Sequence, residues 1–218
     1  MNERIKIYNE DCLKAMNRVE DNFYDLAIVD PPYGIDMADW DKKTDIPTSE
    51  YFTELFRISK NQVIFGGNYF DLPHTESWVC WDKTFNDDIK GGKLTQGGCP
   101  RERMSDFELI WTSFEHKAKM FRFTQIGNLI GFGKNIKVDY EHEKKIHPTQ
   151  KHKLVYSWIL NEYAKPDFKI IDTHLGSGSI ALACWDFGCY LDGYEISKSY
   201  YEGAFKRIKK YTNQLQLW

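Results

Sequence analysis

A carboxylate, two prolines and a tyrosine stand together in Asp30-Pro31-Pro32-Tyr33, directly after an apolar run at residues 25–29. Proline donates no hydrogen bond to a strand ladder, so the predicted strand ends at this pair. The Asp30 carboxylate and the Pro31 carbonyl are two acceptors that the paired prolines would hold rigidly. Such acceptors can pull on both protons of an aromatic amino group, whose lone pair is otherwise delocalised into its ring. Tyr33 offers a flat face on which a base can stack.

A glycine-rich turn lies between an apolar run at residues 169–172 and an apolar helical pattern that runs to about residue 187. Without a Cβ atom, Gly176 and Gly178 would let the backbone approach a nucleotide-like ligand. Glu195 follows at the end of the next predicted strand, where a carboxylate can accept both hydroxyl protons of a ribose. Taken alone, the pattern fits either a nicotinamide dinucleotide or S-adenosylmethionine (SAM). The residues of the turn are Asp172, Thr173, His174, Leu175, Gly176, Ser177, Gly178 and Ser179.

In combination, the two patterns resemble the amino-directed DNA methyltransferases of the DPPY type. Their order, with the Asp30 motif first and the glycine-rich turn late, is similar to that of the beta class. The resemblance implies in-line transfer of the SAM methyl group to the amino group of a base swung out of double-stranded DNA, with no covalent enzyme intermediate. It implies that the catalytic residues are Asp30, Pro31, Pro32 and Tyr33.

The resemblance covers nearly the whole chain and also implies which residues hold the cofactor SAM. Residues 9–13 resemble the segment that touches the SAM adenine, and residues 147–151 resemble the segment that closes the cofactor pocket. Glu195 falls on the ribose-binding position, while residues 66–70 and 81–83 resemble motifs that shape the base pocket. The implied cofactor-binding residues are Asp11, Cys12, Asp30, His147, Thr149, Lys151, Asp172, His174, Gly176, Ser177, Gly178, Ser179 and Glu195.

The chain departs from the family pattern at two places. Thr173-His174 stands where the family often has Pro-Phe, and His152 stands where a proline is common. We expect packing or cofactor contact for His174, since no second His or Cys lies at metal-ligand spacing. The predicted chemistry needs no metal ion.

Asp30 favours adenine N6 as the methylated atom, because the family's cytosine amino methyltransferases more often begin this motif with Ser. Cytosine N4 is the nearest alternative. Methylation at cytosine C5 needs a cysteine nucleophile, typically after a proline, and Cys99 precedes Pro100 instead. RNA or protein glutamine methylation is usually associated with Asn at the first position of the motif and with the opposite motif order. Two readings come from other classes: a nicotinamide-dependent oxidoreductase, which leaves the Asp30 motif without a role, and a catalytically silent DNA-binding module.

Hydrophobic periodicity predicts the elements that position these residues. Six runs indicate strands, at residues 25–29, 62–65, 77–81, 107–111, 169–172 and 190–194, and apolar positions at helical spacing follow at 154–159 and 200–208. Alternating strands and helices predict an α/β, Rossmann-like methyltransferase fold with a mainly parallel sheet of about seven strands. We expect a catalytic half at 1–83, sheet completion and a small inserted target-recognition region at 84–146, and a cofactor-binding half at 147–218.

Charge is uneven along the chain, although its formal net value is only -3. Residues 1–50 carry 6 basic and 12 acidic side chains, whereas residues 115–151 carry 8 and 4. The basic interval overlaps the expected recognition region and is the place to look for DNA contacts. Met37 and Trp40, in the loop after the Asp30 motif, are expected mainly to pack that loop. Candidate phosphate or base contacts are Lys90, Lys93, Arg101, Arg103, Lys117, Lys119, Arg122, Lys134 and Lys137.

With 218 residues, 42% of them hydrophobic, the chain has the composition of one globular domain with an inserted lobe. It has no run of about 18 apolar residues, so we expect no membrane association and a cytoplasmic location. Five cysteines without a C-x-x-C pair favour reduced thiols. The small recognition region favours a short target or a homodimer. The compactness favours a solitary phage or bacterial enzyme, and the sequence leaves open whether a restriction nuclease accompanies it, as in restriction–modification systems.

Overall fold

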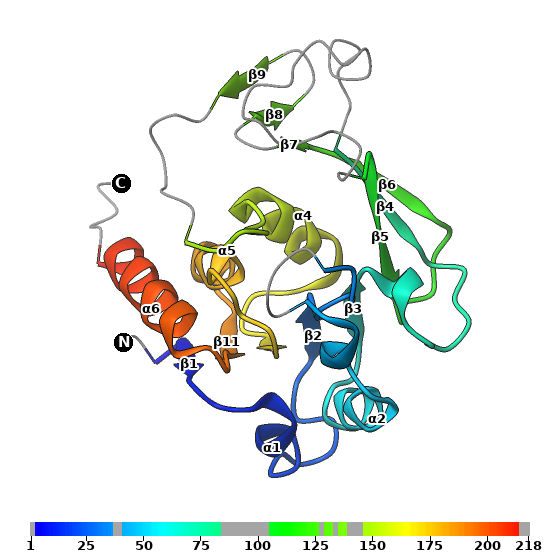
Figure 1. Ribbon diagram of the computed structural model, residues 1–218, viewed down its shortest axis with the longest axis vertical. Helices are drawn as coiled ribbons and strands as arrows, with labels where there is room; N and C mark the ends of the chain where they lie inside the picture. The colour runs from blue at the N-terminus through cyan, green and yellow to red at the C-terminus, as the bar shows by residue number, and fades with distance from the viewer. Residues whose placement is uncertain are drawn as a thin grey trace.

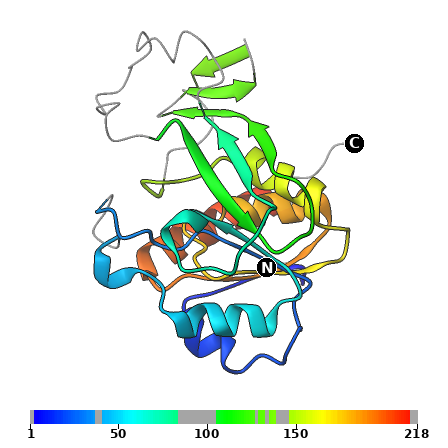
Figure 2. The same ribbon diagram turned by 90° about the vertical axis from the view of Figure 1, so that its right-hand side faces the viewer.

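The computed structural model describes residues 3–36, 41–83, 105–126, 129–132, 135–138 and 146–213. Within this part of the chain, eight strands form one sheet with helices on both faces (Figures 1 and 2), which confirms the predicted α/β class. The strand order is β1 (Ile5–Tyr8), β11 (Tyr190–Tyr194), β10 (Lys169–Asp172), β2 (Leu26–Val29), β3 (Gln62–Phe65), β5 (Phe107–Thr112), β4 (Val79–Asp82) and β6 (Lys119–Arg122).

The sheet is mainly parallel, as predicted. The strands β1, β11, β10, β2 and β3 run parallel in that order, while β5 is antiparallel to both β3 and β4. The central strands β2 and β3 are buried along their whole length, as expected for strands covered on both faces. The edge strands β1 and β6 were not among the predicted strands.

Alternating side chains of β2 build the two halves of the core. Leu26 and Ile28 belong to the cluster that packs against α4 (Lys153–Tyr163), α5 (Ser179–Phe187) and α6 (Lys198–Thr212). Ala27 and Val29 belong to the cluster on the opposite face, against α1 (Cys12–Met16) and α2 (Ser49–Ile58). The period of two in a strand therefore gives three layers, with α1 and α2 together on one side of the sheet (Figure 2).

A separate small sheet follows β6. It consists of the antiparallel strands β7 (Thr124–Ile126), β8 (Leu129–Phe132) and β9 (Asn135–Val138). It lies at the top of Figure 1, beyond α4 and the strands β4 to β6. Of the predicted inserted region 84–146, strands β5 and β6 thus complete the main sheet. Residues 84–104, including the candidates Lys90, Lys93, Arg101 and Arg103, lie outside the described residues, as do Met37, Trp40 and Lys134.

Strand order also brings the two sequence motifs together. Asp30 follows β2, the glycine-rich turn follows β10, and these two strands are parallel neighbours. Glu195 follows β11, which pairs with the other side of β10. The carboxyl ends of all three strands therefore meet at one edge of the sheet, where open α/β sheets bind their ligands. No helix among the described residues is long and apolar enough to cross a membrane.

Candidate active site

A cleft of about 1000 Å³ opens at the carboxyl ends of β2, β10 and β11. It is continuous between the Asp30 motif and the glycine-rich turn. Of the sequence-predicted site residues, those that line it are Asp30, Pro31, Pro32, Tyr33, His147, Thr149, Lys151, His174, Gly176, Ser177 and Glu195. The lining does not include the other predicted residues, Asp11, Cys12, Asp172, Gly178 and Ser179.

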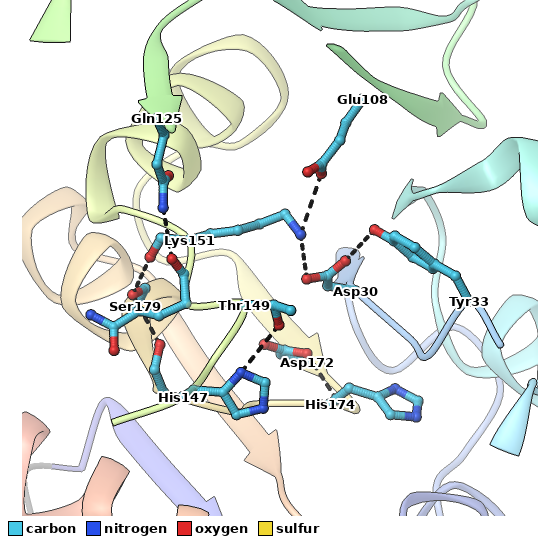
Figure 3. A network of polar contacts seen from close by, with 12 residues as sticks. Asp30, Tyr33, Glu108, Gln125, His147, Thr149, Lys151, Asp172, His174 and Ser179 are labelled. Atoms are coloured by element: carbon cyan, nitrogen blue, oxygen red, sulfur yellow. Dashed lines mark hydrogen bonds and ion pairs between the residues drawn. The ribbon is translucent and has the colours of Figure 1, made fainter. Parts of the chain in front are cut away.

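Both carboxylate oxygens of Asp30 are engaged (Figure 3). The Tyr33 hydroxyl donates to Oδ1 at 2.5 Å, and the Lys151 ammonium donates to Oδ2 at 2.5 Å. Asp30 therefore connects the strand end of β2 with the segment that precedes α4. The arrangement holds a negatively charged acceptor at a fixed point in the cleft.

Tyr33 is fixed in place by ring contacts and by its backbone. Its ring stacks on Tyr69, with centroids 4.9 Å apart and planes 9° from parallel. Asp41 Oδ1 accepts the backbone N–H of Tyr33 at 2.8 Å. Burial, with the nearby charges of Asp30 and Glu108, raises the pKa of Tyr33 well above its usual value, so its hydroxyl stays protonated and donates to Asp30.

Gly66, the first residue of the predicted base-pocket motif 66–70, lies directly against Tyr33. It has a φ of +63°, and a Cβ atom there would lie 2.3 Å from Cε1 of the Tyr33 ring. Only glycine combines this backbone conformation with that close approach.

Lys151 lies in a row of alternating charges that consists of Asp30, Lys151, Glu108 and Lys83. Its Nζ atom lies 3.4 Å from Glu108 Oε2, and Lys83 donates to Glu108 Oε1 at 3.0 Å. Burial opposes the charge on Lys151, but Asp30 and Glu108 outweigh it and raise the pKa of the lysine. Burial likewise opposes the charge on Glu108, and the two lysines outweigh it and lower the pKa of the carboxyl. Lys151 and Glu108 are therefore both ionised at neutral pH.

The glycine-rich turn is held from two sides. Glu195 Oε2 accepts the Gly176 N–H at 2.9 Å, and its Oε1 accepts the Ser197 N–H at 2.8 Å. A carboxylate has about four lone-pair sites, so acceptor capacity is left on Glu195 toward the cleft. Behind the turn, Arg207 donates to the Ser177 carbonyl at 2.9 Å and to the Ser179 hydroxyl at 2.9 Å.

Both histidines beside the turn are neutral, because burial lowers the pKa of His147 and of His174 to about 4 each. The His147 ring lies against Gly176 and packs on Tyr200 at 4.5 Å between centroids. Thr149 contacts His147 Nδ1 at 3.2 Å. The segment predicted to close the pocket therefore lies over the glycine-rich turn.

Asp172, Asp11 and Cys12 have contacts of their own outside the lining of the cleft. Asp172 Oδ1 accepts the His174 N–H at 3.0 Å, and burial raises the pKa of Asp172 to about 8. Asp11 caps α1 by accepting the Lys14 N–H at 3.0 Å. Burial raises the pKa of Cys12 to about 12, so this cysteine is a thiol.

Sequence reasoning missed several residues of the cleft. The sequence pattern places Glu108 only in a strand, and the family resemblance assigns Lys151 only to the cofactor, whereas the Lys151 ammonium pairs with Asp30. The sequence does point to Lys83, because this residue lies in the segment 81–83 that resembles a base-pocket motif. Tyr69, of the predicted base-pocket motif 66–70, also lines the cleft. Further lining residues that the sequence did not single out for chemistry are Ser105, Phe107, Gln125, Tyr156, Ile196, Ser197 and Tyr200.

Comparison with known proteins agrees with this geometry. Residues 72–206 match the family model described as DNA methylase. The type II methyltransferase M.HpaI of Haemophilus parainfluenzae is 24% identical over 95% of this chain and 74% of its own length. The type II methyltransferase M.HinfI of Haemophilus influenzae is also 24% identical, over 94% of this chain and 68% of its own length.

Solved structures share the fold. The crystal structure of M1.HpyAVI as a SAM complex has a TM-score of 0.58 at 21% identity and covers 93% of this chain and 99% of its own. The cytosine-N4-specific PvuII DNA methyltransferase has a TM-score of 0.60 at 12% identity and covers 98% of this chain and 93% of its own. Since the family model matches more than half of the chain, this protein belongs to the DNA methylase family, which includes enzymes directed at N6 and at N4 amino groups.

Proposed function

We propose that this DNA methyltransferase transfers the methyl group of SAM to the N6 amino group of adenine in double-stranded DNA, at a specific site. One observation carries the proposal: the Asp30 carboxylate and the glycine-rich turn with Glu195 line the same cleft. Asp30 offers the acceptor that an amino group needs, and the turn offers the backbone that a nucleoside needs. The DNA methylase match supports SAM over a nicotinamide dinucleotide as the ligand of the turn.

The residues of the turn fit SAM. Gly178 has a φ of +72°, and a Cβ atom on it would lie 2.9 Å from Ile208 Cδ1, so the tight bend before α5 depends on glycine. Glu195 stands at the end of β11 with acceptor capacity for the ribose hydroxyls. His147 and Thr149 would cover the opposite side of the ligand. Asp11 and Cys12, at the start of α1, would reach the adenine end.

When bound, SAM supplies an electrophilic methyl group, and the nitrogen–carbon bond forms as the carbon–sulfur bond breaks with its electron pair passing to sulfur. The Asp30 carboxylate and the Pro31 carbonyl accept the amino protons and thereby localise the nitrogen lone pair. Asp30 then takes the proton that the methylated nitrogen loses. Tyr33 stacks on the base, and the rigid prolines keep these groups oriented, which contributes to the rate through placement.

Adenine is preferred over cytosine because the motif begins with Asp30. The N4-cytosine reading is the second candidate, since the PvuII enzyme, which has that specificity, shares the fold. The matches to type II methyltransferases support a role in site-specific DNA modification, as in restriction–modification systems. Residues 84–146 are proposed to read the target, and homodimerisation would extend the DNA that the small chain covers.

Nucleoside analysis tests the proposal. The purified protein is incubated with methyl-labelled SAM and unmethylated genomic DNA, and the digested nucleosides are separated. Label in N6-methyladenosine is expected. Label in N4-methylcytosine would keep the chemistry and change the base, whereas SAM binding without label in DNA would favour a silent DNA-binding module.

A further inference from the structure

Lys151 holds the acceptor that the proposed reaction requires. Its ammonium donates to Asp30 Oδ2, while the Tyr33 hydroxyl donates to Oδ1. An entering amino group must therefore share Asp30 with a positively charged donor. A carboxylate neutralised by an ammonium group pulls less strongly on an amino proton, and the ammonium also repels the positive sulfur of SAM.

Glu108 offers Lys151 a second partner. Its Oε2 atom is buried and forms only a long ion pair with Lys151 Nζ, at 3.4 Å, so this oxygen can accept a closer contact from the ammonium. In Figure 3 the lysine ammonium lies between the two carboxylates, with Asp30 on one side and Glu108 on the other. A displacement of less than about 1 Å would bring nitrogen and oxygen to the usual separation of about 2.9 Å. The flexible four-carbon stem of lysine allows such a movement.

Glu108 itself is held still. Lys83 donates both to Glu108 Oε1 and to the Ser105 hydroxyl, each at 3.0 Å. Glu108 lies in β5, paired with Trp81 of β4. The Phe65 ring lies 4.6 Å from Lys151 Nζ and provides a surface that favours a cation beside either carboxylate. Of the groups around the ammonium, the lysine side chain, with its flexible four-carbon stem, is therefore the part that we expect to move.

We propose that Glu108 is a positioning residue that draws Lys151 away from Asp30 when the target base enters, so that Asp30 Oδ2 accepts the amino group. This inference rests on the proposed function and deepens it. In the free enzyme Lys151 donates to Asp30 Oδ2, and in the complex with the target base this oxygen accepts the amino group instead. Asp30, Lys151, Glu108 and Lys83 alternate in charge within one cleft, and buried ion pairs are by themselves weak evidence for stability. The proposed movement of Lys151 gives this arrangement a function.

Second-site suppression tests the inference. Single-turnover methylation is measured at saturating SAM and DNA for wild type, Glu108→Gln, Lys151→Met and the double variant. Glu108→Gln is expected to slow transfer by about tenfold or more while SAM affinity stays within about twofold. The double variant is expected to regain most of the lost rate, because methionine at position 151 donates no hydrogen bond to Asp30. Glu202→Gln, which neutralises an exposed glutamate of α6, is the matched control and keeps the wild-type rate.

Each outcome is decisive. A wild-type rate for Glu108→Gln would overturn the inference, and so would a slow variant that Lys151→Met does not rescue, since a purely structural role of Glu108 gives that result. Wild-type protein that binds SAM but methylates no DNA would overturn the proposed function itself, and the inference with it.

A crystal structure of the wild-type protein with S-adenosylhomocysteine and target DNA tests the inference without any substitution. We expect Lys151 Nζ to donate a hydrogen bond to Glu108 and the base amino group to donate one to Asp30. Lys151 still on Asp30, with the amino group bound elsewhere, would contradict the inference.

Discussion

The ammonium of Lys151 donates a hydrogen bond to the Asp30 carboxylate at 2.5 Å across 121 positions of the sequence. This contact joins the strand end that carries the DPPY motif to the segment that precedes α4. It places a residue that the sequence assigned only to the cofactor at the proposed catalytic acceptor. The two halves of the cleft are therefore coupled through one buried ion pair.

Glu195→Gln should weaken SAM binding more than it slows transfer. The amide keeps one acceptor oxygen in place of the two that hold Gly176 and Ser197, and hydrogen bonds to a charged group contribute about 1.5–3 kcal/mol. We expect the KM for SAM to rise by about tenfold or more, with kcat within about threefold. Initial-rate kinetics measure both, and Glu202→Gln on the exposed face of α6 is the control. An unchanged KM for SAM would show that Glu195 does not bind the ribose.

Gly66→Ala should destabilise the protein and impair methylation together. The new Cβ atom would lie 2.3 Å from the Tyr33 ring at a φ of +63°, and strain of this kind costs about 1–3 kcal/mol. Thermal unfolding and 2-aminopurine fluorescence of a labelled target report stability and base stacking. Gly203→Ala in α6, where the nearest atom is the flexible end of Ile146 at 3.3 Å, should change neither. Wild-type stability of Gly66→Ala would show that Tyr33 is not confined by this contact.

Asp172→Asn should stabilise the protein increasingly as the pH rises. Burial raises the folded-state pKa of Asp172 to about 8 from an ordinary value of 3.8, so the folded protein binds the extra proton between these limits. Its contribution to stability is fully present below about pH 4 and is lost as the pH rises to about 8. The amide keeps the oxygen that accepts the His174 N–H and has no charge to bury.

Chemical denaturation at a series of pH values measures this effect. The free energies of unfolding of Asp172→Asn and wild type should be similar near pH 4 and diverge in favour of the variant up to about pH 8. Asp167→Asn, at an exposed carboxylate paired with Arg4, is the control. A difference independent of pH would contradict the raised pKa.

Chelation of divalent metal ions should leave methyl transfer unchanged. The methyl donor carries its own positive charge, and the Asp30 and Pro31 acceptors activate the amino group without a Lewis acid. Initial rates with and without EDTA, in otherwise identical buffer, measure the effect. A rate that EDTA abolishes and added magnesium restores would require a metal step.

The core of the fold could be predicted because its strands are continuous apolar runs. The strands β3, β10 and β11 have the bounds that the sequence predicts, and β2 begins one residue later. The strands β1 and β6 lie at the edges of the sheet, where alternation leaves only Ile5 and Ile7 buried in the first and Phe121 in the second. So few buried residues give too weak a hydrophobic signal for a four-residue strand.

Sequence motifs located both sides of the site but not the charges between them. Asp30, Gly176 and Glu195 each follow a predicted strand, so their meeting at one sheet edge follows from the parallel topology. Glu108 reaches the cleft only because β5 enters the sheet antiparallel between β3 and β4. No local pattern encodes that order, and the pairing with Lys151 therefore appears only in three dimensions.

The most direct test compares wild type with Asp30→Ala. Methyl label transferred from SAM to N6-methyladenosine in unmethylated DNA is measured beside SAM affinity, and Asp25→Asn at the opposite end of β2 is the control. The account predicts transfer by wild type and the control, and a loss on the order of 10²–10⁴-fold for Asp30→Ala with SAM affinity nearly unchanged. Wild-type turnover by Asp30→Ala would contradict the assignment of the active site.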